Sequence, residues 1–589
     1  MIWLLAAFFG LATLSPLVMR ILGQRGFLFY ALIPLAAAIW LGVHGPAVLA
    51  GTVIVEGFEW IPTLGVGFTF RIGLLQWVLG LVVTVIGAIV LFYCRSYFSH
   101  DPPQARVAGL LVAFAGAMLG LVTSDDLIAL YVFWELTTVF SYLLVGHNPL
   151  RAANRGAAMT ALIVTTFGGL AMLVGILILG AKANSFSLAV VLDAGLSGPL
   201  VTVAVALLLL GAVTKSAQIP FHFWLPGAMA APTPVSAYLH AAAMVKAGIY
   251  LIAVFAPAFA DDPLWRPTVL ILGSVTMIVG GWRALRQTDI KLLLAYGTVS
   301  QLGFLTVMNG LGTASASLAG LALLVSHALF KSALFLVVSI VDHSTGTRDL
   351  NELSGVGRQI PVVAVAAILA GASMAGFPPL LGFISKESAF ESILYLISDH
   401  GDGTDILPGP ALLLVAAMVV GSILTVAYTL RFLWGAFADK SRVSGRTPVA
   451  HVGPVFGSSP VLLALAGLVF GLLGAQLTTA FSGFVDQFTI GHAAHGLALW
   501  HGGVTLPLLL SLLCWVLGAV IFSWRVSFGR LQETFPEVMS AQEAYGHVMR
   551  GLDRAAVEVT ARAQRGSLPI YLGTIMVVLV LFTGGVVLT

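Results

Sequence analysis

Apolar runs long enough to cross a lipid bilayer recur along almost the entire chain, and no other feature limits its fold as strongly. A transmembrane helix needs about 20 predominantly apolar residues, and by that measure the sequence contains about sixteen spans. Of its 589 residues 59% are hydrophobic and only 9% are charged, whereas a soluble domain carries roughly 25% charged residues. We therefore predict an all-α, polytopic membrane protein. The predicted spans are 2–19, 27–43, 72–94, 107–122, 126–146, 157–180, 199–231, 233–256, 267–283, 290–309, 315–341, 361–398, 410–437, 459–477, 504–524 and 569–588.

Two of these spans, 199–231 and 361–398, are too long for one straight crossing. Each contains a proline break, at Pro220 and Pro226 in the first and at Pro378 and Pro379 in the second. If each is one broken helix, nearly all arginine-rich loops fall on one side of the membrane, as the positive-inside rule requires. We expect that side to be the cytoplasm and both termini to lie outside the cell membrane. No basic segment precedes the first span, which favours a membrane span over a cleaved signal.

The spans also form a repeat. Residues 107–256 and 257–437 each hold five spans, and the broken helix is fourth in both groups. Because five is odd, the second group must be inverted relative to the first, an architecture typical of ion-coupled transporters. Three spans in 1–106 precede the repeats, two in 438–524 follow them, and 569–589 holds the last span.

Residues 525–568 are too polar to cross a membrane and have an amphipathic pattern. One apolar stripe recurs at alternating steps of three and four residues, and Pro536 suits the start of such a helix. We expect this helix to lie along the cytoplasmic surface of the bundle or the membrane. The stripe consists of Val538, Ala541, Tyr545, Val548, Leu552, Ala555 and Val559.

Composition argues against several classes of function. The formal net charge of +3 is too small to indicate nucleic-acid binding. Cys94 and Cys514 are the only cysteines, and two thiolates do not hold an iron–sulfur cluster or a structural zinc ion. "GAVTKS" at 211–216 lacks the spacing of a nucleotide-binding P-loop. The histidines show no close metal-ligand spacing, so we expect no metal, haem or other cofactor.

Several ionisable residues nevertheless lie within predicted spans. A charge at the bilayer centre costs roughly 3 kcal/mol, so such residues usually face a bundle interior or a water path. Glu135 in 126–146 is either a proton-carrying acid or a neutral carboxyl bonded to Thr138 or Tyr131. Lys215, just before the first break, either lines a polar pocket with His222 and its neighbours or snorkels to the interface.

A second pair lies in "SAYLHAAAMVKAGIYLI". Lys246 is about midway along the span 233–256, too deep for easy snorkelling. His240 lies six residues earlier, so on one continuous helix the two point to different faces. This placement suits residues that link sites on either side of the helix.

The second repeat also has ionisable residues within its predicted spans. His327 and Lys331 are at i, i+4 and share a helix face, and Lys386 precedes Glu387 just after the second break. Lys291 is the weakest member, because snorkelling or an ion pair with the nearby Asp289 explains it as well as function does. Burial disfavours a charged side chain and a neighbouring opposite charge favours it. Buried Glu, Lys and His residues that influence one another therefore predict a proton relay.

The motifs that carry these residues resemble a known family. "KSAQIPFHFWLPGAMAAPTPVSAYLHAAAMVKAGIYLI", "DIKLLLAYGTVSQLG", "SHALFKSALF" and "GFPPLLGFISKE" are similar to the antiporter-like subunits shared by respiratory complex I and the multi-subunit Mrp-type cation/proton antiporters. The likeness covers roughly residues 65–440. The sequences of these motifs are most similar to those of the large A-type subunits of the Mrp complexes. That branch usually continues beyond this length with further spans, so we expect either a truncated chain or a separate chain for the remainder. Gly227 and Ala230 stand at positions where members of this family often have a polar and an acidic residue.

The resemblance implies roles for individual residues. Glu135 and Lys215 match the glutamate–lysine pair of a first half-channel, and His240 and Lys246 match connecting residues. Lys331 and Lys386 match the second half-channel and its exit.

Three hypotheses follow for the function. The first is a proton-translocating subunit of a multi-subunit sodium or other monovalent cation/proton antiporter, with other membrane subunits as partners. The second is a proton-pumping subunit of a redox-driven complex, and only this assignment makes the chain part of an enzyme. The third is a membrane scaffold whose buried charges hold helices together.

Overall fold

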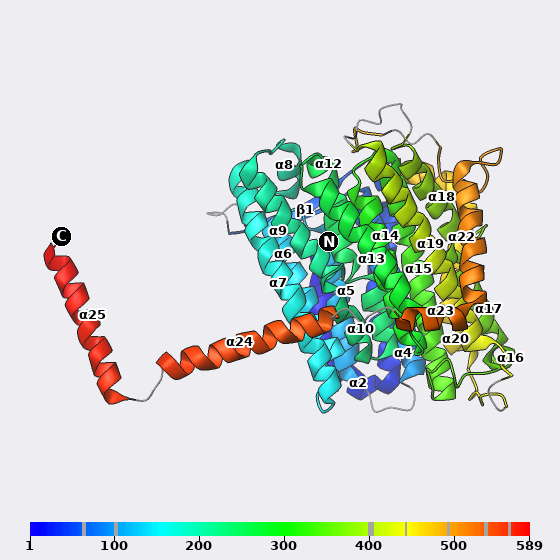
Figure 1. Ribbon diagram of the computed structural model, residues 1–589, viewed down its shortest axis with the longest axis horizontal. Coiled ribbons are helices and arrows are strands. Elements are labelled where there is room, and N and C mark those ends of the chain that lie inside the picture. The colour runs from blue at the N-terminus through cyan, green and yellow to red at the C-terminus, as the bar shows by residue number, and fades with distance from the viewer. Residues whose placement is uncertain are drawn as a thin grey trace. The chain divides into compact units, whose positions relative to one another are not determined.

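The computed structural model describes residues 1–61, 66–98, 104–397, 404, 406–441, 445–491, 495–534, 540–563 and 567–588. The chain divides into two compact units, Met1–Thr534 and Phe535–Thr589. Helices dominate both units, as predicted (Figure 1).

The first unit is a bundle of helices with one small sheet. Its long helices are α1 (Ile2–Thr13), α2 (Ser15–Leu22), α3 (Gly26–Leu49), α4 (Leu74–Tyr97), α5 (Ala105–Thr123), α6 (Leu127–Val145), α7 (Ala152–Ala183), α9 (Pro199–Lys215), α12 (Lys246–Phe259), α13 (Trp265–Ala284), α14 (Ile290–Gly310), α15 (Ala314–Thr345), α17 (Pro361–Ala375), α18 (Leu381–Leu394), α19 (Pro408–Phe437), α20 (Pro454–Leu472), α21 (Gly474–Val485), α22 (Leu506–Ser523) and α23 (Arg525–Thr534). Short helical pieces are η1 (Gly23–Arg25), α8 (Leu188–Asp193), η3 (Phe221–Phe223), α10 (Trp224–Gly227), η4 (Ala228–Ala230), α11 (Thr233–Ser236), η5 (Ala237–Ala242) and α16 (Val356–Gln359).

Thirteen helices in the described part of the chain are long and apolar enough to cross a membrane. Three shorter apolar helices, Ile2–Thr13, Pro199–Lys215 and Pro361–Ala375, coincide with three further predicted spans. The prediction of a polytopic membrane protein is therefore confirmed, although the count of sixteen spans is not.

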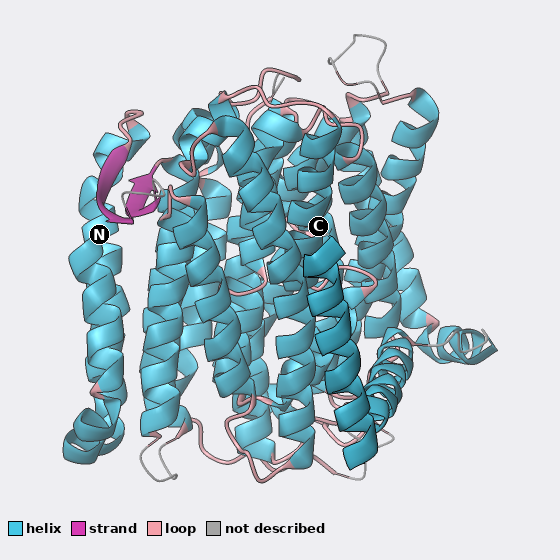
Figure 2. Cartoon of the chain, turned by 90° about the vertical axis from the view of Figure 1, so that its left-hand side faces the viewer, coloured by secondary structure: helices cyan, strands magenta, loops and turns pink. Residues whose placement is uncertain are grey.

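A β-hairpin lies where a loop was predicted. Strands β1 (Ile54–Ile61) and β2 (Val66–Ile72) pair antiparallel, with Ile54 opposite Ile72. Figure 2 shows this hairpin in magenta beside the N-terminus. The amino group of Met1 forms an ion pair with Glu56 of β1 at 2.5 Å. The hairpin thus anchors the first helix at this end of the bundle.

Both predicted breaks are present. The chain leaves α9 at Lys215 and passes through a cis Ile219–Pro220 peptide into η3 and α10. It leaves α17 at Ala375 and passes a cis Pro378–Pro379 peptide before α18. Proline lacks the N–H that continues a helix, so each break falls where the sequence places its prolines. In Figure 1, α9 starts from the end that carries α8 and α17 from the end that carries α16, so the two run in opposite directions.

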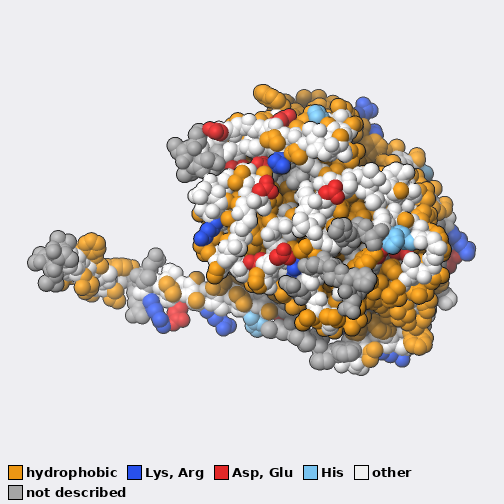
Figure 3. Space-filling model, turned by 90° about the horizontal axis from the view of Figure 1, so that it is seen from above, with side chains coloured by type: hydrophobic (Ala, Val, Ile, Leu, Met, Phe, Trp, Pro, Cys, Tyr) orange, Lys and Arg blue, Asp and Glu red, His pale blue; other side chains and the backbone are white. Residues whose placement is uncertain are grey.

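Many of the arginines lie at one end of the bundle, whereas Arg71 lies on β2 in the hairpin at the other end. Helices α2, which contains Arg20, and α16, which contains Arg358, lie at the lower end of Figure 1. The upper end, seen in Figure 3, presents sparse acidic and basic side chains among uncharged and hydrophobic ones. This asymmetry agrees with the loop charges from which the topology was predicted.

The core of the first unit is centred on α14 and α15, whose side chains are almost all buried. Their polar residues therefore lie inside protein. This burial places His327 and Lys331 of α15 in the interior of the bundle.

The second unit contains α24 (Ala541–Ala563) and α25 (Leu568–Leu588). The predicted amphipathic helix is thus present as α24. Ser540 and Glu543 form a reciprocal capping box, with backbone-to-side-chain bonds of 2.8 and 3.2 Å. Pro536 and Val538, part of the prediction, lie outside the described residues.

Candidate functional site

Lys215, the last residue of α9, reaches across to α6. Its Nζ donates to the carbonyl of Trp134 at 2.9 Å and to the hydroxyl of Thr138 at 2.7 Å. The ammonium also lies 5.0 Å from the centre of the Trp134 ring. The side chain is fully buried. Lys215 therefore faces the protein interior and does not snorkel.

Glu135 follows Trp134 on α6 and is half-buried. Its Oε1 has no hydrogen-bond partner among the described residues. The Thr138 hydroxyl donates to the Trp134 carbonyl at 3.3 Å, so the alternative of a Glu135–Thr138 bond is not observed. A Cβ on Gly169 of α7 would lie 2.1 Å from Oε1. The absence of a side chain at Gly169 thus leaves the space that the carboxyl occupies.

The helix that carries Lys246 is broken at its centre. A π-helical turn, η5, ends at Ala242, and α12 begins at Lys246. The Lys246 ammonium donates to the carbonyl of Ala241 in that turn. The continuous helix assumed for this span is therefore wrong, and so is the face argument built on it. The break gives Lys246 a backbone acceptor that a regular helix would keep for itself.

His240 lies in the π-turn and His327 on α15, and both are fully buried. No ring nitrogen of either histidine has a hydrogen-bond partner in the described chain. Ser332 of α15 donates to the Ala237 carbonyl at 3.2 Å, which joins α15 to the turn. His327 is within electrostatic range of both Lys246 and Lys331. His327 and Lys331 therefore lie one helical turn apart on α15, which packs against the turn that precedes Lys246.

Lys331 binds α14. Its Nζ donates to the Leu294 carbonyl at 3.2 Å and lies 5.8 Å from the centre of the Tyr428 ring. Gln301 donates to the Tyr428 hydroxyl at 3.3 Å and to Thr425 at 3.1 Å. This neutral polar cluster was not predicted from the sequence, although Thr425 and Tyr428 lie three residues apart on one helix face.

Lys386 lies after the second break. Its Nζ donates at 2.9 Å to the carbonyl of Met374, in the last turn of α17. Carbonyls in the last turn of a helix have no partner within it, so Lys386 closes this end. The neighbouring Glu387 accepts a 3.4 Å bond from Thr505 at the start of α22, and its Oε2 has no partner in the described chain.

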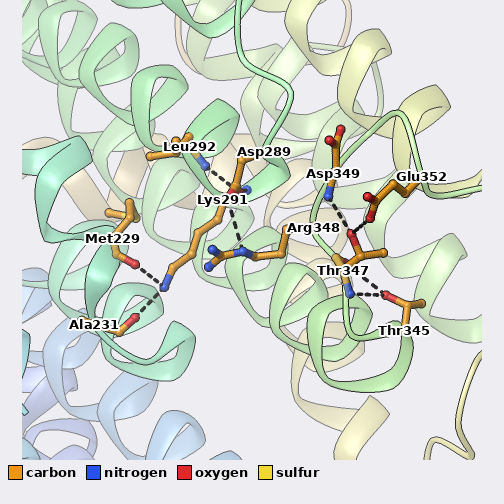
Figure 4. Close-up of polar contacts among 10 residues, drawn as sticks. All are labelled: Met229, Ala231, Asp289, Lys291, Leu292, Thr345, Thr347, Arg348, Asp349 and Glu352. Atoms are coloured by element: carbon orange, nitrogen blue, oxygen red, sulfur yellow. Dashed lines mark hydrogen bonds and ion pairs between the residues drawn. The ribbon is translucent and has the colours of Figure 1, made fainter. Parts of the chain in front are cut away.

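Lys291 neither snorkels to the interface nor forms an ion pair with Asp289. Figure 4 shows its Nζ pointing to the carbonyls of Met229 and Ala231, at 2.8 and 2.6 Å. Asp289 instead caps α14 and forms an ion pair with Arg348 at 3.2 Å. Lys291 is buried. It therefore secures the segment that follows the first break, without snorkelling and without an ion pair to Asp289.

The seven predicted residues do not converge on one pocket. Glu135 lies beside Lys215 near the first break, His240 lies in the π-turn, and Lys246 begins the helix after it. His327 and Lys331 share α15, whereas Lys386 lies on α18, after the second break. The seven residues therefore form a series of separate buried polar sites, which we call stations.

Comparisons with known proteins agree with the geometry. The family model described as NADH:quinone oxidoreductase/Mrp antiporter, TM matches residues 124–398. The chain is 34% identical over 558 residues to the A1 subunit of the Na(+)/H(+) antiporter of Staphylococcus haemolyticus, covering 90% of this chain and 68% of that protein. It is 40% identical over 499 residues to the A/B subunit of a probable K(+)/H(+) antiporter of Rhizobium meliloti, covering 83% of this chain and 49% of that protein.

Two solved structures are also similar. A chain of the Mrp complex from Dietzia sp. DQ12-45-1b superposes with a TM-score of 0.88 at 34% identity, covering 100% of this chain and 63% of that one. A chain of respiratory complex I from Thermus thermophilus gives a TM-score of 0.69 at 21% identity, covering 82% and 99%, and shows a shared fold.

The chain therefore spans between about half and two thirds of the length of these antiporter relatives, 49% in one case and 68% in another. The chain belongs to the family of large, A-type cation/proton antiporter subunits, whose transmembrane core is related to that of NADH:quinone oxidoreductase.

Proposed function

We propose that this chain is the proton-translocating large subunit of a multi-subunit monovalent cation/proton antiporter. Relatives that carry the names of Na(+)/H(+) and K(+)/H(+) antiporter subunits support this assignment, as does the likeness to a chain of an Mrp complex. Its partners are other integral membrane subunits, and its cation is Na⁺ or K⁺. No redox cofactor has a role in the proposal.

One observation carries the proposed mechanism. The buried lysines bind backbone carbonyls, with one hydroxyl in addition, and none of them is ion-paired with a carboxylate in the described chain. Removing one charge from a buried ion pair leaves the other uncompensated, at about 3–5 kcal/mol. A lysine held by neutral oxygens, as Lys246, Lys331 and Lys386 are, loses its proton without that penalty. Such a residue is suited to passing protons at membrane depth.

The proposed path follows the stations in order. Glu135 and Lys215 accept and pass the proton, and His240 and Lys246 transfer it across the centre. His327 and Lys331 carry it through the second repeat. Lys386 releases or loads it on the other side.

The proposed topology places the arginine-rich end in the cytoplasm of a cell-membrane protein and both termini outside. The Met1–Glu56 ion pair supports this for the N-terminus, because β1 lies at the end of the first unit opposite to α2 and α16. We also propose a division into three leading spans (1–106), two inverted repeats (107–256 and 257–437), two further spans (438–524), an amphipathic surface segment (525–568) and a final span (569–589).

The test uses everted vesicles that contain the assembled complex. Addition of Na⁺ or K⁺ is expected to collapse an imposed pH gradient, and Lys215→Ala to abolish the response at equal abundance. Lys182→Ala removes an exposed lysine at the end of α7 and is the matched control. A native complex that ignores both cations but acidifies vesicles with a redox substrate would overturn the antiporter assignment. A fully active Lys215→Ala complex would overturn the path.

A further inference from the structure

A continuous groove runs along one flank of the first unit. Its apolar part, about 1390 Å³, is lined by α3, α4, α17 and α20. Its other part, about 850 Å³, is relatively more polar and is lined by η1, the ends of α4 and α15 and the start of α20; we call it the polar part. The two parts share residues 450–454 as lining. We call this surface the α3–α20 groove.

The apolar part has the dimensions of one membrane leaflet. Along α20 the lining extends from Pro454 to Leu465, which is about 16 Å of helix at 1.5 Å per residue. The hydrocarbon core of a bilayer is about 30 Å thick, so one leaflet is about half of that. Leu32, Phe92 and Val362 in this lining are exposed. The groove therefore offers an apolar channel of about the length of an acyl chain.

The polar part carries positive charge. Arg25 and Arg95 line it, and no aspartate or glutamate belongs to its described lining. Neither arginine is ion-paired in the part of the chain that the structure describes. The part lies at the arginine-rich end of the bundle, where α20 also begins. Gly453 precedes α20 without a side-chain cap, so the helix dipole favours an anion there, although Pro454 has no N–H and the Phe456 N–H donates to the Gly453 carbonyl at 3.0 Å.

The two parts together identify the occupant. Lipid tails are as apolar as leucine, so the apolar part alone does not favour one lipid over another. Selection has to come from the headgroup, and arginine binds phosphate oxygens through its planar fork of N–H donors. A headgroup with net negative charge suits two arginines and a helix N-terminus better than a zwitterionic one. Basic pockets between transmembrane helices bind such lipids in membrane proteins.

We propose that the α3–α20 groove is a binding site for an anionic phospholipid of the arginine-side leaflet. The phosphate lies between Arg25 and Arg95 near the start of α20, and one acyl chain follows the apolar part. The lipid then bridges the N-terminal helices α3 and α4 to α17 and α20. This site is independent of the proton path.

The proposal is tested by photolabelling. The complete complex is placed in phosphatidylcholine bilayers that contain phosphatidylglycerol with a photoactivatable diazirine in one acyl chain. Labelled peptides are expected within 26–35 and 454–465. Unlabelled phosphatidylglycerol is expected to compete and phosphatidylcholine is not. The Arg25→Gln/Arg95→Gln double variant is expected to lower labelling about tenfold. Arg20→Gln, at the same end but outside the lining, is the matched control and is expected to change nothing.

A second variant leaves both arginines intact. A Cβ on Gly457 would meet only Val363 Cγ2, at 3.8 Å, so Gly457→Leu fills the groove without a backbone clash. It is expected to abolish labelling while the complex stays assembled. Equal labelling by a phosphatidylcholine probe, or equal competition by both lipids, would overturn the proposal. So would an absence of label in the groove together with cross-links from it to a neighbouring protein of the complex, which would make a partner helix the occupant.

Discussion

Gly169→Ala tests whether the Glu135 carboxyl has to stand where the structure places it. The added Cβ would lie 2.1 Å from Oε1, whereas ordinary contacts begin at 3.4 Å, so the carboxyl has to move by about 1 Å or more. A misplacement of this size costs on the order of 100-fold in rate when the group takes part in the chemistry. We expect cation-driven proton exchange to fall on the order of 10- to 100-fold. The helix itself is not weakened, because alanine is favoured over glycine in helices by about 1 kcal/mol.

Gly156→Ala is the matched control, because it lies on the same helix α7 and a Cβ there meets no atom within 4 Å. Both variants are measured as complete complexes at equal abundance in proteoliposomes, from the initial rate of a pH-sensitive dye. Normal exchange in assembled Gly169→Ala would refute the assigned position of Glu135. Equal losses in both variants would indicate a general effect on α7.

Three further predictions follow from individual contacts. Thr138→Val removes one acceptor of the buried Lys215 ammonium, a loss of about 1–3 kcal/mol, and is expected to slow proton exchange in vesicles without loss of assembly; normal exchange would contradict it. Lys291→Met leaves two carbonyls after the first break without their donor, so hydrogen–deuterium exchange is expected to rise over 228–236, and unchanged exchange would count against this anchoring role. Ser540→Ala removes the capping box of α24, worth about 1 kcal/mol, and is expected to speed amide exchange over 543–547 in the full chain; identical exchange would show that the cap does not stabilise the helix.

The membrane spans were predictable because their signal is local. Apolar length identifies a span, and proline identifies a break, without knowledge of any partner. The hairpin was not predicted, because a strand pair depends on which residues face one another, as Ile54 and Ile72 do. The π-turn also depends on distant contacts, since Tyr238 donates to the Val83 carbonyl and Ser332 to the Ala237 carbonyl.

The sequence predicted which ionisable residues of the site are buried, but it did not predict which groups they bind. The burial of Lys215, Lys246, Lys331 and Lys386 follows from their place in apolar spans. Their acceptors do not, because the Trp134 carbonyl lies 81 residues from Lys215 in the sequence. A backbone acceptor has no sequence signature at all. For the same reason the sequence left Lys291 open, and only its contacts after the first break decide its position.

The proposed path requires protons to cross the bundle through Lys246, and replacement of this lysine tests that step. The complete complex with Lys246→Met is reconstituted in proteoliposomes at native abundance, and Na⁺- or K⁺-driven proton exchange is compared with that of the native complex and of Lys182→Met. We expect loss of exchange in Lys246→Met alone, with assembly intact. Native rates in the Lys246→Met complex would contradict it.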